Sequence, residues 1–216
     1  MNLERKIDQL TKLSQSIKTQ EPPAVTIHQK QAAVTMTDIE KCIHELIMEK
    51  MSPQIMCYSL FYFWLILEAP LRDVTEDEID QWSMSLDEAV ARIIHVIKSE
   101  VDSLPDHEPT PEMEKLGEGV NTLKSYLSDE AFVQMLSPDE HVKQSTNINT
   151  RIHTITSELL KKLFHPEIVF NVLFNYWLRL STLHVSIPEE FHQKLEFYFK
   201  EIISAARKQV PILFKQ

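Results

Sequence analysis

Glycine is scarce in this chain, which has two glycines among 216 residues. At a typical usage of roughly 7%, about 15 would be expected. Phosphate-binding loops and dinucleotide fingerprints need several glycines close together, because the backbone must approach the phosphate and adopt positive φ angles. Gly117 and Gly119 are not followed directly by Lys-Ser or Lys-Thr. Barrels and sandwiches with many tight hairpins are also disfavoured, because their turns favour glycine.

Cysteines and long apolar runs are equally limited. Cys42 and Cys57 are too few for a disulfide framework or a cysteine-based zinc site. The most apolar run, 55–67, has 13 residues, whereas a membrane-spanning helix needs about 20. The N-terminus is charged and lacks the apolar region of a signal peptide. We therefore expect a cytoplasmic protein without a transmembrane segment, and a secreted effector lacking a classical signal peptide stays open as the alternative.

Positive charge is in deficit. The chain has 22 Lys and Arg residues against 32 Asp and Glu residues, a net charge of −10, and no cluster of basic residues interrupts this excess. An acidic protein repels a phosphate backbone. Nucleic acid is therefore not expected as a partner.

Helical periodicity runs through the whole chain and predicts an all-α fold. Apolar residues recur every three or four positions, as on one face of a helix. We expect a first helix up to about Ile17 and a loose linker over 21–35. A capping box at Thr37–Glu40 predicts the next helix start. A helix from Pro53 to about Glu68 and a long one from Thr75 to Val101 should follow.

The second half predicts a similar series of helices after a proline-rich linker at 103–111. One helix carries apolar residues from Met113 to Leu127. Ser137–Glu140 suggests only a brief helical turn, followed by a polar stretch and a helix over 152–163. A helix opening at Pro166 should reach about Ser181, and a capping box at Ser186–Glu189 should open the last one.

An internal repeat is the strongest observation. When residues 45–67 are set over 158–180, an offset of 113, nine of 23 positions are identical without a gap. Pro53 falls on Pro166, and Trp64 falls on Trp177. Matched leucines alone could be coincidence, but proline, tryptophan and helix order agree as well. We predict a tandem duplication of a roughly four-helix bundle unit, with copies at 1–106 and 107–216 packed together.

The two copies differ along one helical stripe. The first copy carries Tyr58, Tyr62 and Ile66, where the second carries Asn171, Asn175 and Arg179. The first set has two interpretations, a partner-binding surface or packing against the rest of the protein. The second set also has two, a polar pocket in which Arg179 receives an anionic group or a solvated face.

Chemical signatures are absent from the sequence. No Glu-x-x-His repeat, zinc motif or nucleophile motif is present, and the nine histidines are scattered. We therefore expect no metal, no cofactor and no catalysis, although catalytic residues distant in the sequence stay possible. The favoured hypothesis is a non-catalytic protein–protein interaction or adaptor protein that takes a partner helix or a second copy of itself. The alternative is a small-ligand-binding protein or cryptic enzyme with a pocket between the copies, near Trp64, Trp177 and Arg179.

Overall fold

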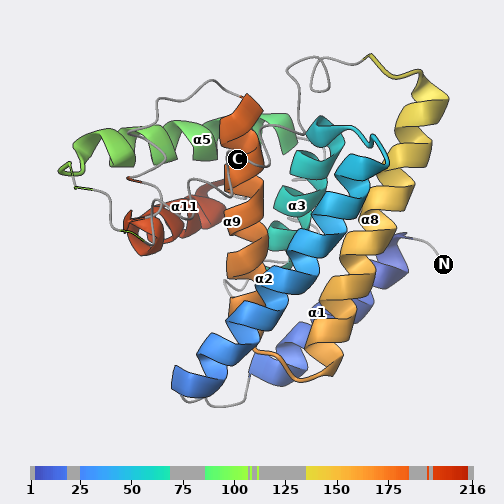
Figure 1. Ribbon diagram of the computed structural model, residues 1–216, viewed down its shortest axis with the longest axis horizontal. Helices are drawn as coiled ribbons and strands as arrows, with labels where there is room; N and C mark the ends of the chain where they lie inside the picture. Colours follow the sequence, from blue (N-terminus) through green and yellow to red (C-terminus); the bar gives the residue numbers. More distant parts are fainter. Residues whose placement is uncertain are drawn as a thin grey trace.

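The computed structural model describes residues 3–18, 25–68, 86–106, 108, 111, 135–184, 194 and 197–213. Within these residues the chain forms seven helices and no strand, so the predicted all-α fold class is confirmed there. Figure 1 shows their arrangement. The helices are α1 (Leu3–Lys18), α2 (Val25–Met48), α3 (Pro53–Glu68), α5 (Leu86–Ser103), α8 (Pro138–Lys161), α9 (Pro166–His184) and α11 (Phe199–Leu213).

Proline begins both central helices, as the sequence predicts. Proline suits the first helical turn, because its missing N–H has no partner there and its φ angle already fits the helix. α3 starts at Pro53 and α9 at Pro166. The Ser52 hydroxyl, just before α3, accepts a hydrogen bond from the Ile55 amide at 3.5 Å, which satisfies an amide that the helix itself leaves unbonded.

Two predicted boundaries are wrong, because helices extend through polar stretches. The expected linker at 21–35 is helical from Val25, and Thr37 lies inside α2, where its hydroxyl donates to the Ala33 carbonyl at 2.9 Å. The expected short turn at Ser137–Glu140 is instead the capped start of the 24-residue helix α8. Serine and threonine hydroxyls in such stretches bond back to carbonyls four residues earlier rather than ending the helix. Contacts with other helices then hold the extended ends.

The turns after α2 and α8 repeat the same backbone geometry. Lys50 and Leu163, which are 113 positions apart, have φ angles of 58° and 61°. The Met51 amide donates to the Leu46 carbonyl at 3.0 Å, and the Phe164 amide donates to the Leu159 carbonyl at 3.1 Å. This is a left-handed helix-ending turn in both places. α3 and α9 likewise begin 113 residues apart, and the described parts of α2 and α8, and of α5 and α11, have the same offset.

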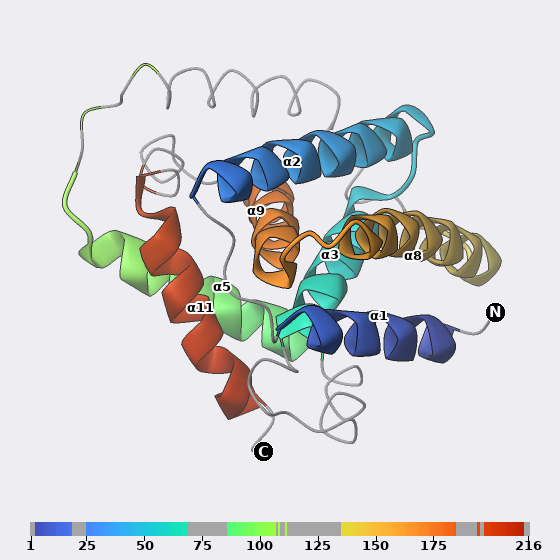
Figure 2. The same ribbon diagram turned by 90° about the horizontal axis from the view of Figure 1, so that it is seen from below.

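The helices of the two halves pack across one another. α3 crosses α9 at the centre, α2 packs on α9, and α8 packs on α3 (Figures 1 and 2). α5 pairs with α11 on the side away from α1 and α8 (Figure 2). The buried apolar side chains form one cluster, to which both halves contribute. The core of the described residues is therefore shared by the two halves.

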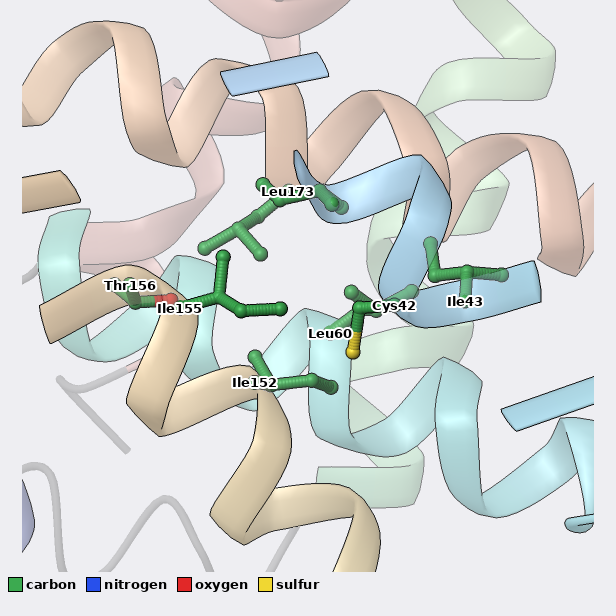
Figure 3. Close-up of a pocket in the computed structure, with 8 residues that line it drawn as sticks. Cys42, Ile43, Leu60, Ile152, Ile155, Thr156 and Leu173 are labelled. Carbon is green, nitrogen blue, oxygen red and sulfur yellow. The ribbon is translucent and has the colours of Figure 1, made fainter. Parts of the chain in front are cut away.

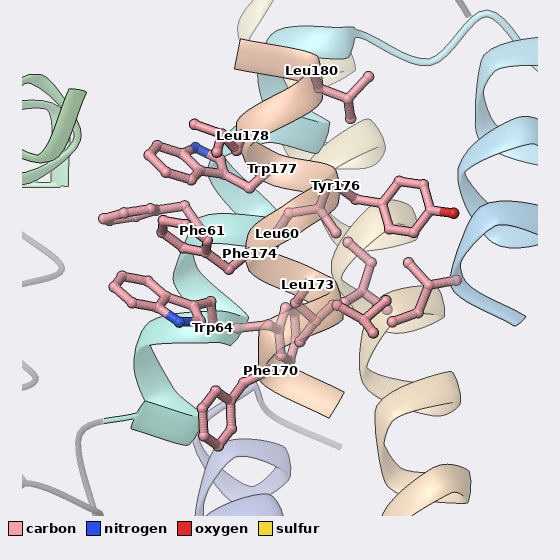
Figure 4. Close-up of a cluster of buried hydrophobic side chains, with 14 of the residues drawn as sticks. Leu60, Phe61, Trp64, Phe170, Leu173, Phe174, Tyr176, Trp177, Leu178 and Leu180 are labelled. Carbon is pink, nitrogen blue, oxygen red and sulfur yellow. The ribbon is translucent and has the colours of Figure 1, made fainter. Parts of the chain in front are cut away.

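Four aromatic rings occupy the crossing of α3 and α9 (Figure 4). Phe61 lies 4.8 Å from Trp177 between ring centroids, and Trp64 lies 4.8 Å from Phe174. Within each helix, Phe61–Trp64 and Phe174–Trp177 are 5.4 and 5.2 Å apart. Phe61 is equivalent to Phe174, and Trp64 is equivalent to Trp177, at the offset of 113. The two cross-helix contacts are therefore equivalent to each other, as are the paired contacts in the interface of a symmetric dimer.

The beginning of the proline-rich segment is attached to the second half. Lys194 contacts the Leu104 carbonyl at 3.0 Å and the Asp106 carboxylate at 2.9 Å. The Tyr198 hydroxyl donates to the Pro105 carbonyl at 3.3 Å. The hydrogen bond and charge of Lys194 lower the pKa of the exposed Asp106 carboxyl. Residues 104–106 therefore lie against the chain near α11.

Some predicted features lie outside the described residues. These are the start of the helix at Thr75, the helix over 113–127 and the capping box at Ser186–Glu189. Within the part of the chain that is described, no helix has both the length and the apolar character needed to cross a membrane.

We predict equal energetic coupling in the two cross-helix aromatic pairs. Double-mutant cycles of Phe61→Leu with Trp177→Leu, and of Phe174→Leu with Trp64→Leu, should each give about 0.5–1.5 kcal/mol. The matching 4.8 Å contacts are the reason. Urea unfolding followed by circular dichroism measures these energies. Coupling in one pair alone would contradict the symmetric crossing.

Candidate functional site

The predicted aromatic stripe of α3 is largely enclosed by the fold. Ile66 has 1% of its surface exposed, whereas Tyr58 and Tyr62 are half-buried. The Tyr62 ring lies 6.0 Å from that of Phe63 in an edge-on arrangement. Partner binding at these three residues stays a prediction, but in this structure Ile66 offers almost no surface to a partner.

The predicted polar stripe of α9 takes part in internal contacts. Asn171 accepts a hydrogen bond from Arg207 of α11 at 2.8 Å, and the same guanidinium lies 3.3 Å from Glu167. It also lies 5.3 Å from the centroid of the Phe170 ring. Arg207 thus links α11 to α9 through charge, hydrogen bonding and ring contact. Asn171 is one of the anchors of this link.

The rest of the polar stripe borders a second internal contact. Arg179 Nε donates to Asn175 Oδ1 one turn earlier on α9. The neighbouring Tyr176 hydroxyl donates to Glu40 of α2 at 3.1 Å. Burial, followed by the charge and hydrogen bond of Glu40, raises the Tyr176 pKa, while Arg179 opposes the rise. The structure therefore places Asn175 and Arg179 together and turns Asn171 towards α11.

Where four helices meet, the space between the halves is nearly filled (Figure 3). A cavity among α2, α3, α8 and α9 leaves about 10 Å³ for the centre of a water molecule, which is room for a single water. Thr156 Oγ1 is buried there and has no hydrogen-bond partner among the described residues. Small-molecule sites are usually 300–1,000 Å³ in volume, so this cavity does not fit a metabolite. Its lining residues are Ile39, Cys42, Ile43, Leu60, Ile152, Ile155, Thr156 and Leu173.

A wider groove of about 540 Å³ runs between α1 and α8. His153 and Ser157 face it, with 3.3 Å between the imidazole Nε2 and the hydroxyl. Both residues lie in the middle of α8, where backbone amides bond within the helix. The groove therefore presents imidazole, hydroxyl, amide and charged side chains to a ligand. Its lining residues are Gln9, Leu13, His153, Thr154, Ser157, Glu158 and Lys161.

A pair of equivalent glutamines connects the two halves. Gln31 of α2 accepts a hydrogen bond from the His165 amide at 3.2 Å, just before α9. Gln144 of α8 accepts one from the Ser52 amide at 2.8 Å, just before α3. Both the glutamines and their donors are 113 positions apart. One bond therefore joins the N-terminal half of α2 to the turn that follows α8, and the other joins the N-terminal half of α8 to the turn that follows α2.

The surfaces around these two glutamines differ in chemistry. Ile27 and Val34 share the face of α2 that carries Gln31, by helical spacing, and Leu163 lies two residues before His165. Their exposed fractions are 50%, 43% and 59%. We call Ile27, Val34 and Leu163 the apolar end.

The equivalent positions at the other glutamine form what we call the polar end. They hold Glu140, Asn147 and Lys50, and Glu140 and Lys50 are exposed. The same backbone arrangement therefore carries Ile27, Val34 and Leu163 at one end and Glu140, Asn147 and Lys50 at the other, where Met48 and Val142 are also exposed.

Sequence reasoning missed the apolar end because Ile27 and Val34 lie in the segment expected to be a linker. A signal was nevertheless present. At the offset of 113, Gln31 falls on Gln144, and Ile27 falls on Glu140. If the alignment at this offset is extended to residues before 45, it contains the identical pair Gln31/Gln144 close to the pair Ile27/Glu140, in which an apolar residue replaces a charged one. This combination would have indicated a helix in this segment, with a surface that differs between the two halves.

Comparison with protein-family models, curated proteins and solved structures found no match to this chain. Among the described residues, no group of three or more His, Cys, Asp and Glu side chains could hold a metal ion. The arrangement of this chain's own residues therefore carries the functional argument.

We predict that Ile66→Arg destabilises the fold by more than about 3 kcal/mol. A charge placed at a position with 1% exposure must be buried without a partner or must displace its neighbours. Tyr58→Asn and Tyr62→Asn, at half-buried positions, should cost less. Urea unfolding of the three variants checks this order. A fully stable Ile66→Arg variant would show that this position reaches solvent.

We predict that stability falls above pH 9 because both cysteines resist ionisation in the folded state. Burial raises the pKa of Cys42 from 9.0 to about 11; the charge of Arg151 opposes this rise, and the charges of Glu45 and Glu49 add to it. Burial also raises the pKa of Cys57 to about 12, opposed by a hydrogen bond with Ser181. The unfolded chain releases these protons first, so alkaline pH favours unfolding.

The alkaline effect of the two thiols together should be about 4–5 kcal/mol between pH 8.5 and 11. The measurement is the free energy of unfolding in urea at each pH, for the wild type and for a Cys42→Ala/Cys57→Ala variant. Other groups titrate equally in both proteins, so the difference between the two pH profiles isolates the thiols. Parallel profiles would contradict the prediction.

Proposed function

We propose that this chain is a non-catalytic protein–protein interaction or adaptor protein that binds its partner at the apolar end. The observation that carries the proposal is the difference between the two ends. Ile27, Val34 and Leu163 expose apolar surface around the Gln31–His165 bond. The polar end has the same type of bond, with Glu140, Asn147 and Lys50 at the three equivalent positions and with Met48 and Val142 exposed nearby.

The polar end indicates what the fold itself requires. Lys50 adopts a φ angle of 58° in the turn after α2, and Leu163 adopts 61° in the turn after α8. A polar residue therefore satisfies this backbone position, and the exposed Leu163 side chain adds nothing that the turn needs. Exposed apolar residues gathered at one place are typical of interaction sites. Binding explains why apolar residues occupy this end.

We also propose that the halves 1–106 and 107–216 are homologous units produced by tandem duplication. The paired helix starts, the paired left-handed turns and the paired glutamine bonds support this history. The symmetric aromatic contacts of α3 and α9 support it too. A duplicated scaffold provides two surfaces with the same backbone geometry. The residues of one surface can then change to bind a partner while the other surface keeps the residues that the fold requires.

A small-ligand-binding function is the second candidate, and the groove between α1 and α8 is the observation that favours it. Its volume of about 540 Å³ falls within the range of ligand sites, and its lining includes amide, hydroxyl, imidazole and charged groups. It ranks second because two helices border it, whereas ligand sites usually enclose most of their ligand.

Site-specific crosslinking should distinguish the two ends. We expect a photoactivatable phenylalanine analogue at Leu163 to crosslink the full-length protein to another protein in an extract of its natural host. The same analogue at Lys50 is the matched control, since both positions are exposed and share one backbone conformation. Mass spectrometry identifies the product. The absence of a protein adduct at Leu163, or equal adducts at both positions, would argue against the proposal.

A further inference from the structure

The cavity among α2, α3, α8 and α9 is lined by equivalent residues of the two halves. Its lining residues form four pairs at the offset of 113, and both members of every pair take part. A space lined in this way lies at the centre of the relation between the halves, where equivalent side chains come together. The pairs are Ile39 and Ile152, Cys42 and Ile155, Ile43 and Thr156, and Leu60 and Leu173.

Two of these pairs differ between the halves, and each difference introduces a smaller and more polar side chain. Cys42 of α2 is equivalent to Ile155, and Thr156 of α8 is equivalent to Ile43. Figure 3 shows both of the smaller residues in the same lining. In Thr156 a hydroxyl replaces the ethyl group that isoleucine carries on Cβ. One hydroxyl and one thiol are therefore the polar side-chain groups that border the cavity.

The Thr156 hydroxyl lacks the bond that other threonines of these helices make. Four of them donate to the carbonyl four residues earlier, at 2.8–2.9 Å, namely Thr35, Thr37, Thr146 and Thr154. Thr156 is completely buried, and its Oγ1 has no hydrogen-bond partner among the described residues. A buried hydroxyl that has lost water without gaining a partner is destabilising. A molecule that hydrogen-bonds to this hydroxyl therefore stabilises the fold.

We propose that this cavity is a binding site for one ordered water molecule, held by a hydrogen bond to Thr156 Oγ1 with the Cys42 thiol as its second polar neighbour. The space of about 10 Å³ for the centre of a water molecule matches one water. A thiol is a weak donor and acceptor. Burial raises the pKa of Cys42 to about 11, so the thiol keeps its proton at neutral pH.

Water fits this site in both size and chemistry. An apolar molecule of the same size would leave the Thr156 hydroxyl unbonded, and a metabolite is too large for the space. Buried waters typically bond to polar groups that the protein leaves without partners. The site lies in the shared core, so it does not rest on the proposed interaction function.

Oxygen relaxation dispersion of isotope-enriched water tests the proposal in solution, because it counts water molecules that stay in a protein for longer than the protein takes to tumble. The samples are the full-length wild type, Thr156→Val and Thr154→Val. Valine keeps the shape of threonine and removes the hydroxyl. We expect Thr156→Val to lose one long-lived water. The matched control Thr154→Val, at an exposed position of the same helix, should lose none.

The direction of a change in melting temperature gives a second readout. Cys42→Val adds volume to the cavity and displaces the water, while the Thr156 hydroxyl remains. We expect its melting temperature to fall by about 2–4 °C, because the hydroxyl loses its bond. The double variant Cys42→Val/Thr156→Val should melt higher than Cys42→Val, since it has no hydroxyl that needs a partner.

The proposal is overturned if Thr156→Val keeps all the long-lived waters of the wild type, or if Thr154→Val loses one as well. A higher melting temperature in Cys42→Val would also contradict it, because filling a dry cavity stabilises a core. A double variant that melts no higher than Cys42→Val would assign the loss to crowding and would exclude the Thr156 hydrogen bond.

Discussion

The aromatic contact between α3 and α9 is the interaction on which the described fold depends. Phe61 and Trp64 each reach across to the opposite helix, at equal centroid distances of 4.8 Å. Trp64 and Trp177 are almost completely buried, and large aromatic side chains contribute much of the apolar area that stabilises a core. Since each half supplies one helix to this contact, neither half holds this part of the core alone. The other contacts between the two halves lie around this crossing, where α2 packs on α9 and α8 packs on α3.

The equivalent positions of the two halves separate what the fold needs from what it does not. Gln31 and Gln144 make the same bond, and Lys50 and Leu163 make the same turn. Glu40 and His153 are also equivalent, but Glu40 receives a bond from Tyr176, whereas His153 lies 6.4 Å from the Phe63 ring. The identical residues Gln31 and Gln144 thus maintain the contacts between each long helix and the turn that follows the other one. Differing residues change the chemistry of the surface without changing the backbone, and the apolar end belongs to this second group.

The described residues leave little enclosed space in the core and a wider groove at the surface. Side chains fill the space where α2, α3, α8 and α9 meet so closely that the remaining cavity has room for a single water molecule. Arg207 binds both Asn171 and Glu167, which connects α11 to α9. Binding groups towards solvent are instead found in the α1–α8 groove and at the apolar end. Lys161 lines the groove and also precedes Leu163, so the two surfaces are neighbours along α8.

The sequence by itself determined the all-α class, the proline starts of α3 and α9, and the offset that relates the halves. These features are local, because helical spacing, caps and prolines act within a few residues. It did not determine the N-terminal ends of α2 and α8, where apolar residues are interspersed with polar ones and form no continuous stripe. Only the tertiary structure decided these ends, because Gln31 and Gln144 bond to amides more than 90 positions away. The same long-range pairing joins His165, two residues after Leu163, to Gln31 of α2, and no local pattern contains this proximity.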